Sequence, residues 1–580
     1  MAEGNPSGGG GITGFGKFVL TLAVLGVIGF GGWKWMQNQK APPAPPANPG
    51  TPQAPGRGPA PSAPGVPAAP AAPVEMPPSD EVVAPEDATP SLPAPGTYFP
   101  KDGVVDVELS DYAGYAGLVA ANGGLEPNGD SVFARKHGFK VRIALSEEEA
   151  FGRLNSGALG ATATTVDVLA VLGKPFQATV PAMFGYSRGA DAVVVRSDIK
   201  KVNDLKGKVV ASVQFLENDF FLRYLVQEAG IPVHAMKDLS EAPDPAAVNV
   251  VYCDDAPGAA ELFLRFLKAG HPGVAGFVGW APHTTDAVSR SGGKAYALAT
   301  TNNILVVADV LVVNRGFAQA NPKMVAGLVE GILEGNRWLR TDPEPHLEAL
   351  SKAFKWDRGR AREELRKVHP CNLAENLAFF SGSIDSGGSF GGIYQSAILA
   401  YGTELLKDAP DADRFADLQH LRAMEASGAF KEDRVAIAPT KSGGKAAIEK
   451  DPLLSKSIRF QFLANKDTMD MDDKGNLKGL ADVKTLLSVS PGSLLILRGH
   501  VSGEKKKDFL AEGGEPMLRK ATLQAVELSK RRAADVKRVL ADLQKVDPSR
   551  IEVEGRGWNE PLPGDPELSR RVEVLWYTLE

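Results

Sequence analysis

The sequence predicts an α/β protein in which two globular regions follow a long non-globular N-terminal part. Three observations lead to this prediction. The chain has 580 residues, more than one hydrophobic core usually organises. Many of its 43 prolines are concentrated near the N-terminus. Beyond residue 97, short β-branched runs alternate with helical patterns of apolar residues, and this alternation is typical of α/β domains.

The first apolar segment is a charge-free run from Phe18 to Trp33. It reaches membrane-spanning length over residues 15–36, where flanking lysines extend their charged ends to the interface. A cleavable signal peptide is the alternative, but no small-x-small cleavage site follows the run. We therefore expect a transmembrane helix over 15–36 after a flexible segment, 1–14. Basic residues on both sides leave its orientation open.

Residues 37–97 are dominated by Pro, Ala and Gly, a composition that cannot bury a core. We expect a disordered linker here. Proline favours an extended polyproline II backbone, so a segment of this length reaches on the order of 100 to 170 Å. Such a reach suits a spacer that crosses a compartment of the cell envelope.

Composition and motifs exclude several classes of function. The net charge of −6 gives no general attraction for nucleic acid. Cys253 and Cys371 are the only cysteines, so neither a disulfide framework nor a zinc ribbon can form, and whether the two pair stays open. A G-x-S-x-G match at 387–391 lacks the apolar strand that a nucleophile elbow needs. We predict no catalytic activity and no cofactor.

An acidic run at 467–476 resembles a calcium-binding loop, but the spacing of its oxygen ligands does not fit one. Lys474 stands where an oxygen ligand is needed, and Ala481 stands where the bidentate glutamate is expected. We expect a surface turn before a helix and no metal site.

The middle region, 98–430, has the length and pattern of two α/β lobes. Strands are predicted at VVDVEL, FKVRIAL, ADAVVVR, KVVASV and ILVVADVLVVN, and helices at DFFLRYLVQEAG and PKMVAGLVEGILEGNRWLRT. Five stretches resemble the nitrate/sulfonate/taurine type of periplasmic solute-binding protein of ABC transporters. They lie at 111–124, 153–169, 189–231, 279–288 and 311–325.

That resemblance implies two lobes joined by crossing strands, a small-molecule solute held in the cleft, and an ABC transporter permease as a partner. The positions of the motifs give a set of candidate ligand-binding residues: Tyr112, Tyr115, Thr164, Thr165, Asp191, Glu217, Asp219 and Trp280, with Thr162, Asn218 and His283 beside them. Thr164, Thr165 and Asp219 have the alternative role of helix caps, and Trp280 that of a core residue. Glu217 and Asp219 would repel an oxyanion, which favours a cationic or neutral solute.

After a second linker, 431–455, residues 456–580 resemble the OmpA-like domain that associates with peptidoglycan. The matching motifs are Arg498-Gly499-His500, LSKRRAADV from Leu528, Gly555-Arg556-Gly557 and Ser569-Arg570-Arg571-Val572-Glu573. The predicted order is strand, helix, strand, helix, strand, strand, which makes a small α+β sandwich.

The resemblance also assigns a wall-binding site. An aspartate and an arginine of the family hold the diaminopimelate group, and Arg532 matches that arginine. Ser502 stands in the aspartate position, Ala525 stands where an asparagine is usual, and a charged insertion, 503–520, separates the motifs. Loss of the carboxylate removes a contact worth roughly 1.5 to 3 kcal/mol, so we expect peptidoglycan binding that is weak or lost.

The order of the parts leads to one hypothesis and one alternative. The hypothesis is a single-pass inner-membrane protein, with most of the chain in the periplasm, that binds a solute and reaches toward the wall. The alternative is a structural envelope protein whose cleft no longer binds a solute.

Overall fold

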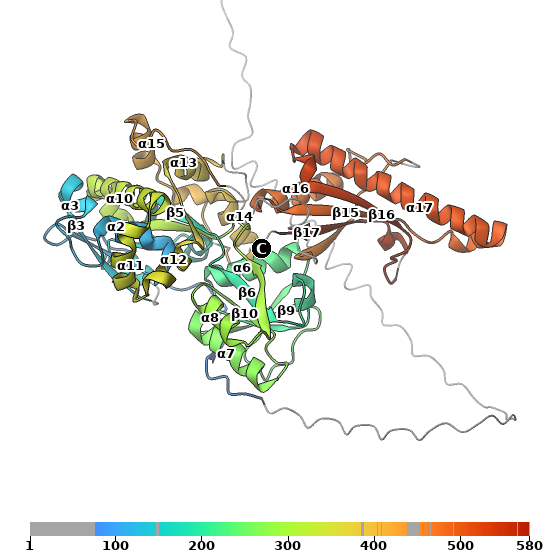
Figure 1. The fold of residues 1–580 in the computed structure, drawn as a ribbon, viewed down its shortest axis with the longest axis horizontal. Helices are drawn as coiled ribbons and strands as arrows, with labels where there is room; N and C mark the ends of the chain where they lie inside the picture. The colour runs from blue at the N-terminus through green and yellow to red at the C-terminus, as the bar shows by residue number, and fades with distance from the viewer. Residues whose placement is uncertain are drawn as a thin grey trace, which may run out of the picture. The chain divides into compact units, whose positions relative to one another are not determined.

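A computed structural model of the chain describes residues 76–578, apart from 147–149, 384–387, 403, 408, 438–451, 464–465, 491 and 565 (Figure 1). The chain divides into two units, Met1–Ala72 and Pro73–Glu580. The expected transmembrane helix at 15–36 and most of the expected linker at 37–97 lie outside the described residues. Within the described part, no helix combines the length and apolar character needed to cross a membrane.

The first lobe contains a six-stranded sheet in the order β13-β5-β12-β4-β2-β3. Strand β2 is parallel to β3 and β4, whereas β12 is antiparallel to both β4 and β5. The strands are β2 (Val104–Leu109), β3 (Lys140–Leu145), β4 (Ala161–Thr165), β5 (Ala178–Ser187), β12 (Ala308–Asn314) and β13 (Val368–Pro370).

Ten helices and 3-10 turns of the described chain accompany this sheet: η1 (Ala113–Tyr115), α2 (Ala116–Asn122), α3 (Val132–His137), α4 (Phe151–Asn155), α5 (Val166–Leu172), α9 (Arg315–Ala320), α10 (Pro322–Thr341), η3 (Glu344–His346), α11 (Leu347–Phe354) and α12 (Arg358–Leu365). The predicted helix at 322–341 is observed as α10. It approaches α2 so closely that a side chain on Gly335 would clash with the carbonyl group of Gly117.

The second lobe contains a seven-stranded sheet in the order β1-β9-β7-β10-β6-β11, with β8 also paired to β9. Its strands are β1 (Val82–Val83), β6 (Ala192–Arg196), β7 (Val209–Ser212), β8 (Val233–Ala235), β9 (Val248–Cys253), β10 (Gly276–Gly279) and β11 (Ala295–Thr300). Its helices are η2 (Val202–Leu205), α6 (Glu217–Glu228), α7 (Ala256–Ala269) and α8 (His283–Arg290).

Strand β1 differs from the expectation that residues 37–97 are disordered throughout. Val82 and Val83 pair antiparallel with Tyr252 and Cys253 at the edge of the second sheet. Glu81 forms an ion pair with Arg265 beside them. These two β-branched residues have no proline between them, so their backbone groups can form the hydrogen bonds of an edge strand. The surrounding proline-rich sequence cannot, because proline has no backbone N–H to donate.

After β2, the chain crosses between the two lobes at 188–191 and at 301–307, and hydrogen bonds tie these two crossings together. Ser187 N donates to Val307 O at 3.1 Å, and Thr301 N donates to Asp191 O at 3.0 Å. The Ser187 and Thr301 hydroxyl groups are 2.6 Å apart. The strand predicted at 304–314 begins only at Ala308, because the residues before it form the second crossing.

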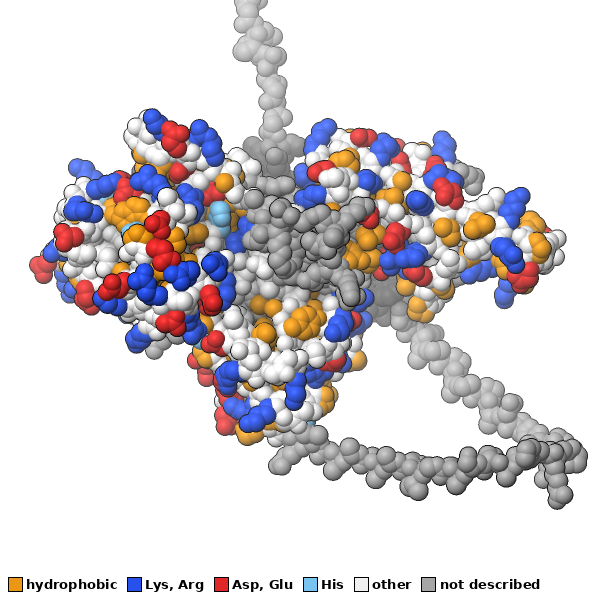
Figure 2. Space-filling model, viewed as in Figure 1, with side chains coloured by type: hydrophobic (Ala, Val, Ile, Leu, Met, Phe, Trp, Pro, Cys, Tyr) orange, Lys and Arg blue, Asp and Glu red, His pale blue; other side chains and the backbone are white. Residues whose placement is uncertain are grey.

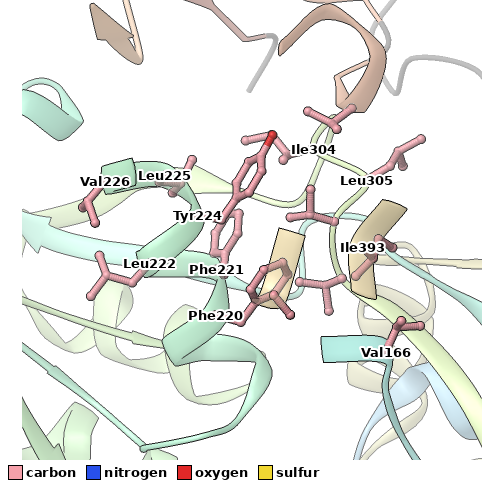
Figure 3. Packing of buried hydrophobic residues seen from close by; sticks show 14 of the residues in the cluster. Val166, Phe220, Phe221, Leu222, Tyr224, Leu225, Val226, Ile304, Leu305 and Ile393 are labelled. Carbon is pink, nitrogen blue, oxygen red and sulfur yellow. The ribbon is translucent and has the colours of Figure 1, made fainter. Parts of the chain in front are cut away.

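Helix α14 (Phe390–Tyr401) packs against α5 of the first lobe and α6 of the second. Figure 3 shows Phe220 and Phe221 of α6 in a buried cluster with Val166 of α5 and Ile393 of α14. Three further helical segments lie near it in sequence: α13 (Leu373–Ser381), η5 (Ala412–Arg414) and α15 (Gln419–Ala426). The serine of the G-x-S-x-G match, Ser389, is the N-cap of α14 and accepts a hydrogen bond from Gly392 N.

The C-terminal part contains a four-stranded sheet in the order β14-β17-β15-β16, in which β15 is parallel to β16 and antiparallel to β17. The insertion at 503–520 forms the first part of α17, which is kinked at Gly513 and Gly514. The elements are β14 (Leu454–Ile458), α16 (Lys474–Val489), β15 (Leu494–His500), α17 (Lys506–Gln544), η7 (Pro548–Arg550), β16 (Ile551–Gly557), η8 (Pro566–Ser569) and β17 (Val572–Tyr577).

The acidic run at 467–476 leads into α16, as expected. Asp473 is the N-cap of that helix, and its carboxylate accepts a hydrogen bond from Asn476 N at 2.9 Å. On the face of the molecule seen in Figure 2, Lys and Arg side chains are interspersed with Asp and Glu side chains. This mixture agrees with the small net charge of the sequence.

Candidate ligand-binding site

A cavity of about 80 Å³ lies in the cleft of the bilobal domain, next to the two crossings. That volume has room for several water molecules or a compact organic group. The first lobe contributes side chains from β2, η1, β4 and β12, and the second lobe contributes Glu217 and Trp280. Because both lobes line it, a ligand in this cavity would contact both at once.

Seven of the eight predicted ligand-binding residues line this cavity: Tyr112, Tyr115, Thr164, Thr165, Asp191, Glu217 and Trp280. Thr162 lines it as well. Asp219, Asn218 and His283 are not among its lining residues. The structure thus brings together residues from five separate stretches of sequence, and their contact with a ligand stays a prediction.

The two tyrosines lie immediately after β2, where the chain turns into η1. Tyr112 is the N-cap residue of η1, and Tyr115 is its last residue. Their rings meet edge to face, with centroids 5.3 Å apart, and Tyr115 makes a similar contact with Phe184 of β5. These contacts fix both rings at the cavity wall.

The threonines come from β4 and its junction with α5. Thr162 Oγ1 donates to Glu108 O at 2.8 Å, which fastens β4 to β2. Thr165 occupies the N-cap position of α5, but its side chain makes no capping hydrogen bond. Its hydroxyl group therefore does not perform the capping role that was the alternative for this residue.

Asp219 lies in the first turn of α6 and is fully buried. Its carboxylate forms an ion pair with Arg223 Nε at 3.0 Å and accepts a hydrogen bond from Phe215 N. Burial raises the pKa of Asp219, and Arg223 opposes that rise. The charge of this carboxylate is therefore compensated within the second lobe.

Two more carboxylates on the cavity wall, Glu108 and Asp309, were not predicted as ligand-binding residues. Glu108 forms an ion pair with Arg153. Asp309 lies in β12 and is only 2% exposed. The sequence signal for Asp309 is a lone carboxylate within the otherwise apolar run ILVVADVLVVN, since a buried charge in a strand needs a partner or a function.

A separate pocket of about 600 Å³ lies in the C-terminal domain, and both predicted wall-binding residues, Arg532 and Ser502, line it. The Arg532 guanidinium lies 4.9 Å from the centre of the Phe462 ring. Burial and the neighbouring charge of Arg570 lower the pKa of Arg532. Glu504, which belongs to the insertion, lines the same pocket and pairs with Arg570 at 3.1 Å.

Within the described residues, two clusters have the composition of a metal site: His369 with Cys371 and Glu375, and His500 with Glu560 and Glu573. In the first, Glu375 already accepts hydrogen bonds from Asn372 N and Ala436 N and faces Arg340. In the second, Glu573 faces Arg498. The nearby arginine charges disfavour a cation at either place.

Two family models match separate parts of this chain. Residues 185–346 match the family described as NMT1/THI5 like, and residues 462–573 match the OmpA family. No curated protein matches the chain.

Several solved structures are similar to this chain. The periplasmic aliphatic sulphonate binding protein SsuA from Escherichia coli has 17% identity and a TM-score of 0.40, over 54% of this chain and 97% of that one. The periplasmic nitrate-binding protein NrtA from Synechocystis has 13% identity and a TM-score of 0.40, over 58% of this chain and 90% of that one. A ligand-binding component of an ABC-type import system from Staphylococcus aureus has 12% identity and a TM-score of 0.40, over 55% and 98%.

Proposed function

We propose that this chain is an envelope protein, without catalytic activity, that binds a small solute in the cleft of its bilobal domain. The observation that supports this proposal is the cavity beside the two crossings, which residues of both lobes line. A ligand that contacts both lobes favours the closed arrangement, because it interacts with more groups there than in an open one.

The proposal includes an anchor and two partners. Residues 15–36 hold the chain in the inner membrane as a single pass, and the Pro/Ala-rich linker lets the folded parts extend into the periplasm. An ABC transporter permease is the proposed recipient of the solute. The C-terminal domain contacts peptidoglycan through the pocket that contains Arg532 and Ser502.

Native mass spectrometry of the full chain in detergent tests solute binding. We expect a small molecule to co-purify and to be released on denaturation. We also expect the melting temperature to rise when that molecule is added back, because a ligand that binds only the folded state stabilises it. A chain that carries nothing and shows no thermal shift across a broad metabolite panel would favour the scaffolding alternative.

A further inference from the structure

Asp191 and Asp309 flank the two crossings at the cavity wall. Asp191 ends the first crossing, directly before β6, and Asp309 is the second residue of β12, directly after the second crossing. Each is only 2% exposed. The chain thus buries two carboxyl groups at the place where its lobes meet.

These two carboxyl groups have oxygen atoms that the described residues leave unpartnered. Oδ1 of Asp191 and Oδ2 of Asp309 are buried and accept no hydrogen bond within the described part of the chain. An unsatisfied buried acceptor costs about 1 to 3 kcal/mol, and native proteins retain few of them. A ligand with hydrogen-bond donors would satisfy both.

The wall around the pair is acidic, since Glu108 and Glu217 also line the cavity. Two of the other carboxylates near the cavity have arginine partners, Glu108 with Arg153 and Asp219 with Arg223. Among the described residues, no Lys, Arg or His forms an ion pair with Asp191 or Asp309, and none lines the cavity. Once both carboxyl groups are ionised, the cationic partner that offsets their charge must therefore come from the ligand.

The rest of the wall suits an organic cation. Tyr112, Tyr115 and Trp280 line the same cavity, and aromatic faces attract ammonium and guanidinium groups while their carbon atoms cover apolar surface. Thr164 and Thr165 add hydroxyl groups that can accept or donate.

We propose that the cleft binds a small organic cation, an alkylammonium or guanidinium compound, whose charged nitrogen atoms donate hydrogen bonds to Asp191 and Asp309. This inference rests on the proposed solute-binding function and adds the chemical class of the solute. It separates this cleft from sites for sulfonate or nitrate, because two buried acidic groups offer an oxyanion no positive charge and repel it when they are ionised.

Three probes of similar size and different charge test this inference on the full chain in detergent. They are methylguanidinium, its neutral near-isostere methylurea, and methanesulfonate. We expect isothermal titration calorimetry at pH 8 to show methylguanidinium binding at least tenfold more tightly than methylurea, and no heat from methanesulfonate.

Isosteric variants locate the site. Asp191→Asn and Asp309→Asn should each weaken methylguanidinium binding at least tenfold, whereas the matched control Asp130→Asn, an exposed aspartate that does not line the cavity, should leave it unchanged. The comparison of the three probes uses the wild-type chain and does not depend on how the variants fold.

Two results would overturn the inference in different ways. Methanesulfonate binding that exceeds methylguanidinium binding, and that survives Asp309→Asn, would reject the cationic class and leave solute binding intact. Failure of all three probes, together with the absence of any co-purified molecule, would reject both this inference and the proposed function.

Discussion

The Tyr115 hydroxyl group donates a hydrogen bond of 3.1 Å to Oδ1 of Asp309, a residue 194 positions later in the sequence. This bond favours the ionised carboxylate and so lowers the pKa of Asp309, whereas burial and the nearby Asp191 raise it well above its ordinary value. Tyr115 is therefore a positioning residue that makes the Asp309 carboxylate more readily available to a cation.

Tyr115→Phe should weaken methylguanidinium binding about 3- to 10-fold at pH 7, which corresponds to one hydrogen bond of roughly 1 kcal/mol. The pKa of Asp309 rises further in the variant, so a larger fraction of the molecules have a protonated Asp309 that must lose its proton before it binds a cation. Calorimetry at pH 6, 7, 8 and 9 should show the defect shrinking as the pH rises.

The control for this prediction is Tyr98→Phe, which removes a similar hydrogen bond to Asp106 outside the cavity. Other buried acids contribute to the same pH profile, because burial raises the pKa of both Asp191 and Asp167 to about 7 and also raises that of Asp219. A defect of Tyr115→Phe that is equal at every pH would indicate a packing role alone.

Asp309→Asn should stabilise the ligand-free chain at pH 8 while it weakens binding. An aspartate whose pKa is raised on folding keeps its proton in the folded state, whereas the unfolded chain ionises above its ordinary pKa of 3.8. Stability therefore falls as the pH rises above that value. Replacement by Asn removes this loss.

We expect the melting temperature of ligand-free Asp309→Asn to exceed that of wild type by about 2 to 4 °C at pH 8, by differential scanning calorimetry. The difference should disappear below about pH 3, where the carboxyl group is protonated in both states. Asp130→Asn serves as the control at both pH values. A lower melting temperature for Asp309→Asn at pH 8 would contradict the prediction.

Glu217→Ala and Trp280→Ala should weaken solute binding far more than they lower stability, because both side chains line the cavity and neither is fully buried. We expect about a tenfold loss of affinity and a change of less than about 2 °C in melting temperature. Equal loss of binding and stability would assign these residues to the core.

Asp219→Ala is the matched contrast to these two variants. It leaves the largely buried Arg223 guanidinium without its carboxylate and should destabilise the domain by about 3 to 5 kcal/mol. Urea unfolding of the three variants side by side distinguishes the two variants at the cavity wall from Asp219→Ala, which should lose stability.

The sequence was most informative about local features. Alternating and β-branched runs predicted β2 and β3, and apolar periodicity predicted α6 and α10. The i,i+4 spacing of Asp219 and Arg223 could have indicated their ion pair, since residues four apart lie on the same side of a helix. The contact of Tyr252 with that pair comes from a neighbouring strand and has no local signal.

The candidate site could be predicted only in part, because its assembly is long-range. The family pattern gave Tyr115 and Asp191, but Asp309 joins them only after the chain has passed through the second lobe and returned. Strand β1 was missed for a similar reason. The sequence around Val82 is rich in proline, and only the exposed edge of β9 gives those residues a partner.

The intact chain should remain with the membrane fraction, and deletion of residues 1–40 should release it, since only that segment of the sequence has the hydrophobicity of a membrane core. The deletion keeps Val82 and Val83, so the second sheet retains its edge strand. Fractionation followed by immunoblotting measures the outcome. Recovery of a mature form that begins after Lys40 would instead indicate a cleaved signal peptide.

The last prediction concerns the pocket of the C-terminal domain, where Arg532 and Ser502 lie together with Glu504. If Arg532 receives the carboxylate of the wall peptide, purified peptidoglycan should retain the chain in a pull-down, and Arg532→Ala should abolish that retention. Arg538→Ala is the control, because Arg538 lies on the same helix, outside the pocket, where it pairs with Asp535.

Glu504 decides how Ser502→Asp behaves. Its carboxylate already pairs with Arg570 in this pocket, so it is available to replace the missing aspartate only if that ion pair opens. If Glu504 stays paired, wild-type binding is weak and Ser502→Asp strengthens it, because the ammonium group of the peptide gains a carboxylate. If Glu504 replaces the missing aspartate, wild-type binding is strong, Glu504→Ala removes it, and Ser502→Asp adds little.

Absence of binding in wild type and Ser502→Asp alike would rule out peptidoglycan as the ligand of this pocket and favour a protein partner. The exposed Glu504–Arg570 pair contributes little stability of its own, so a role in stability does not account for it.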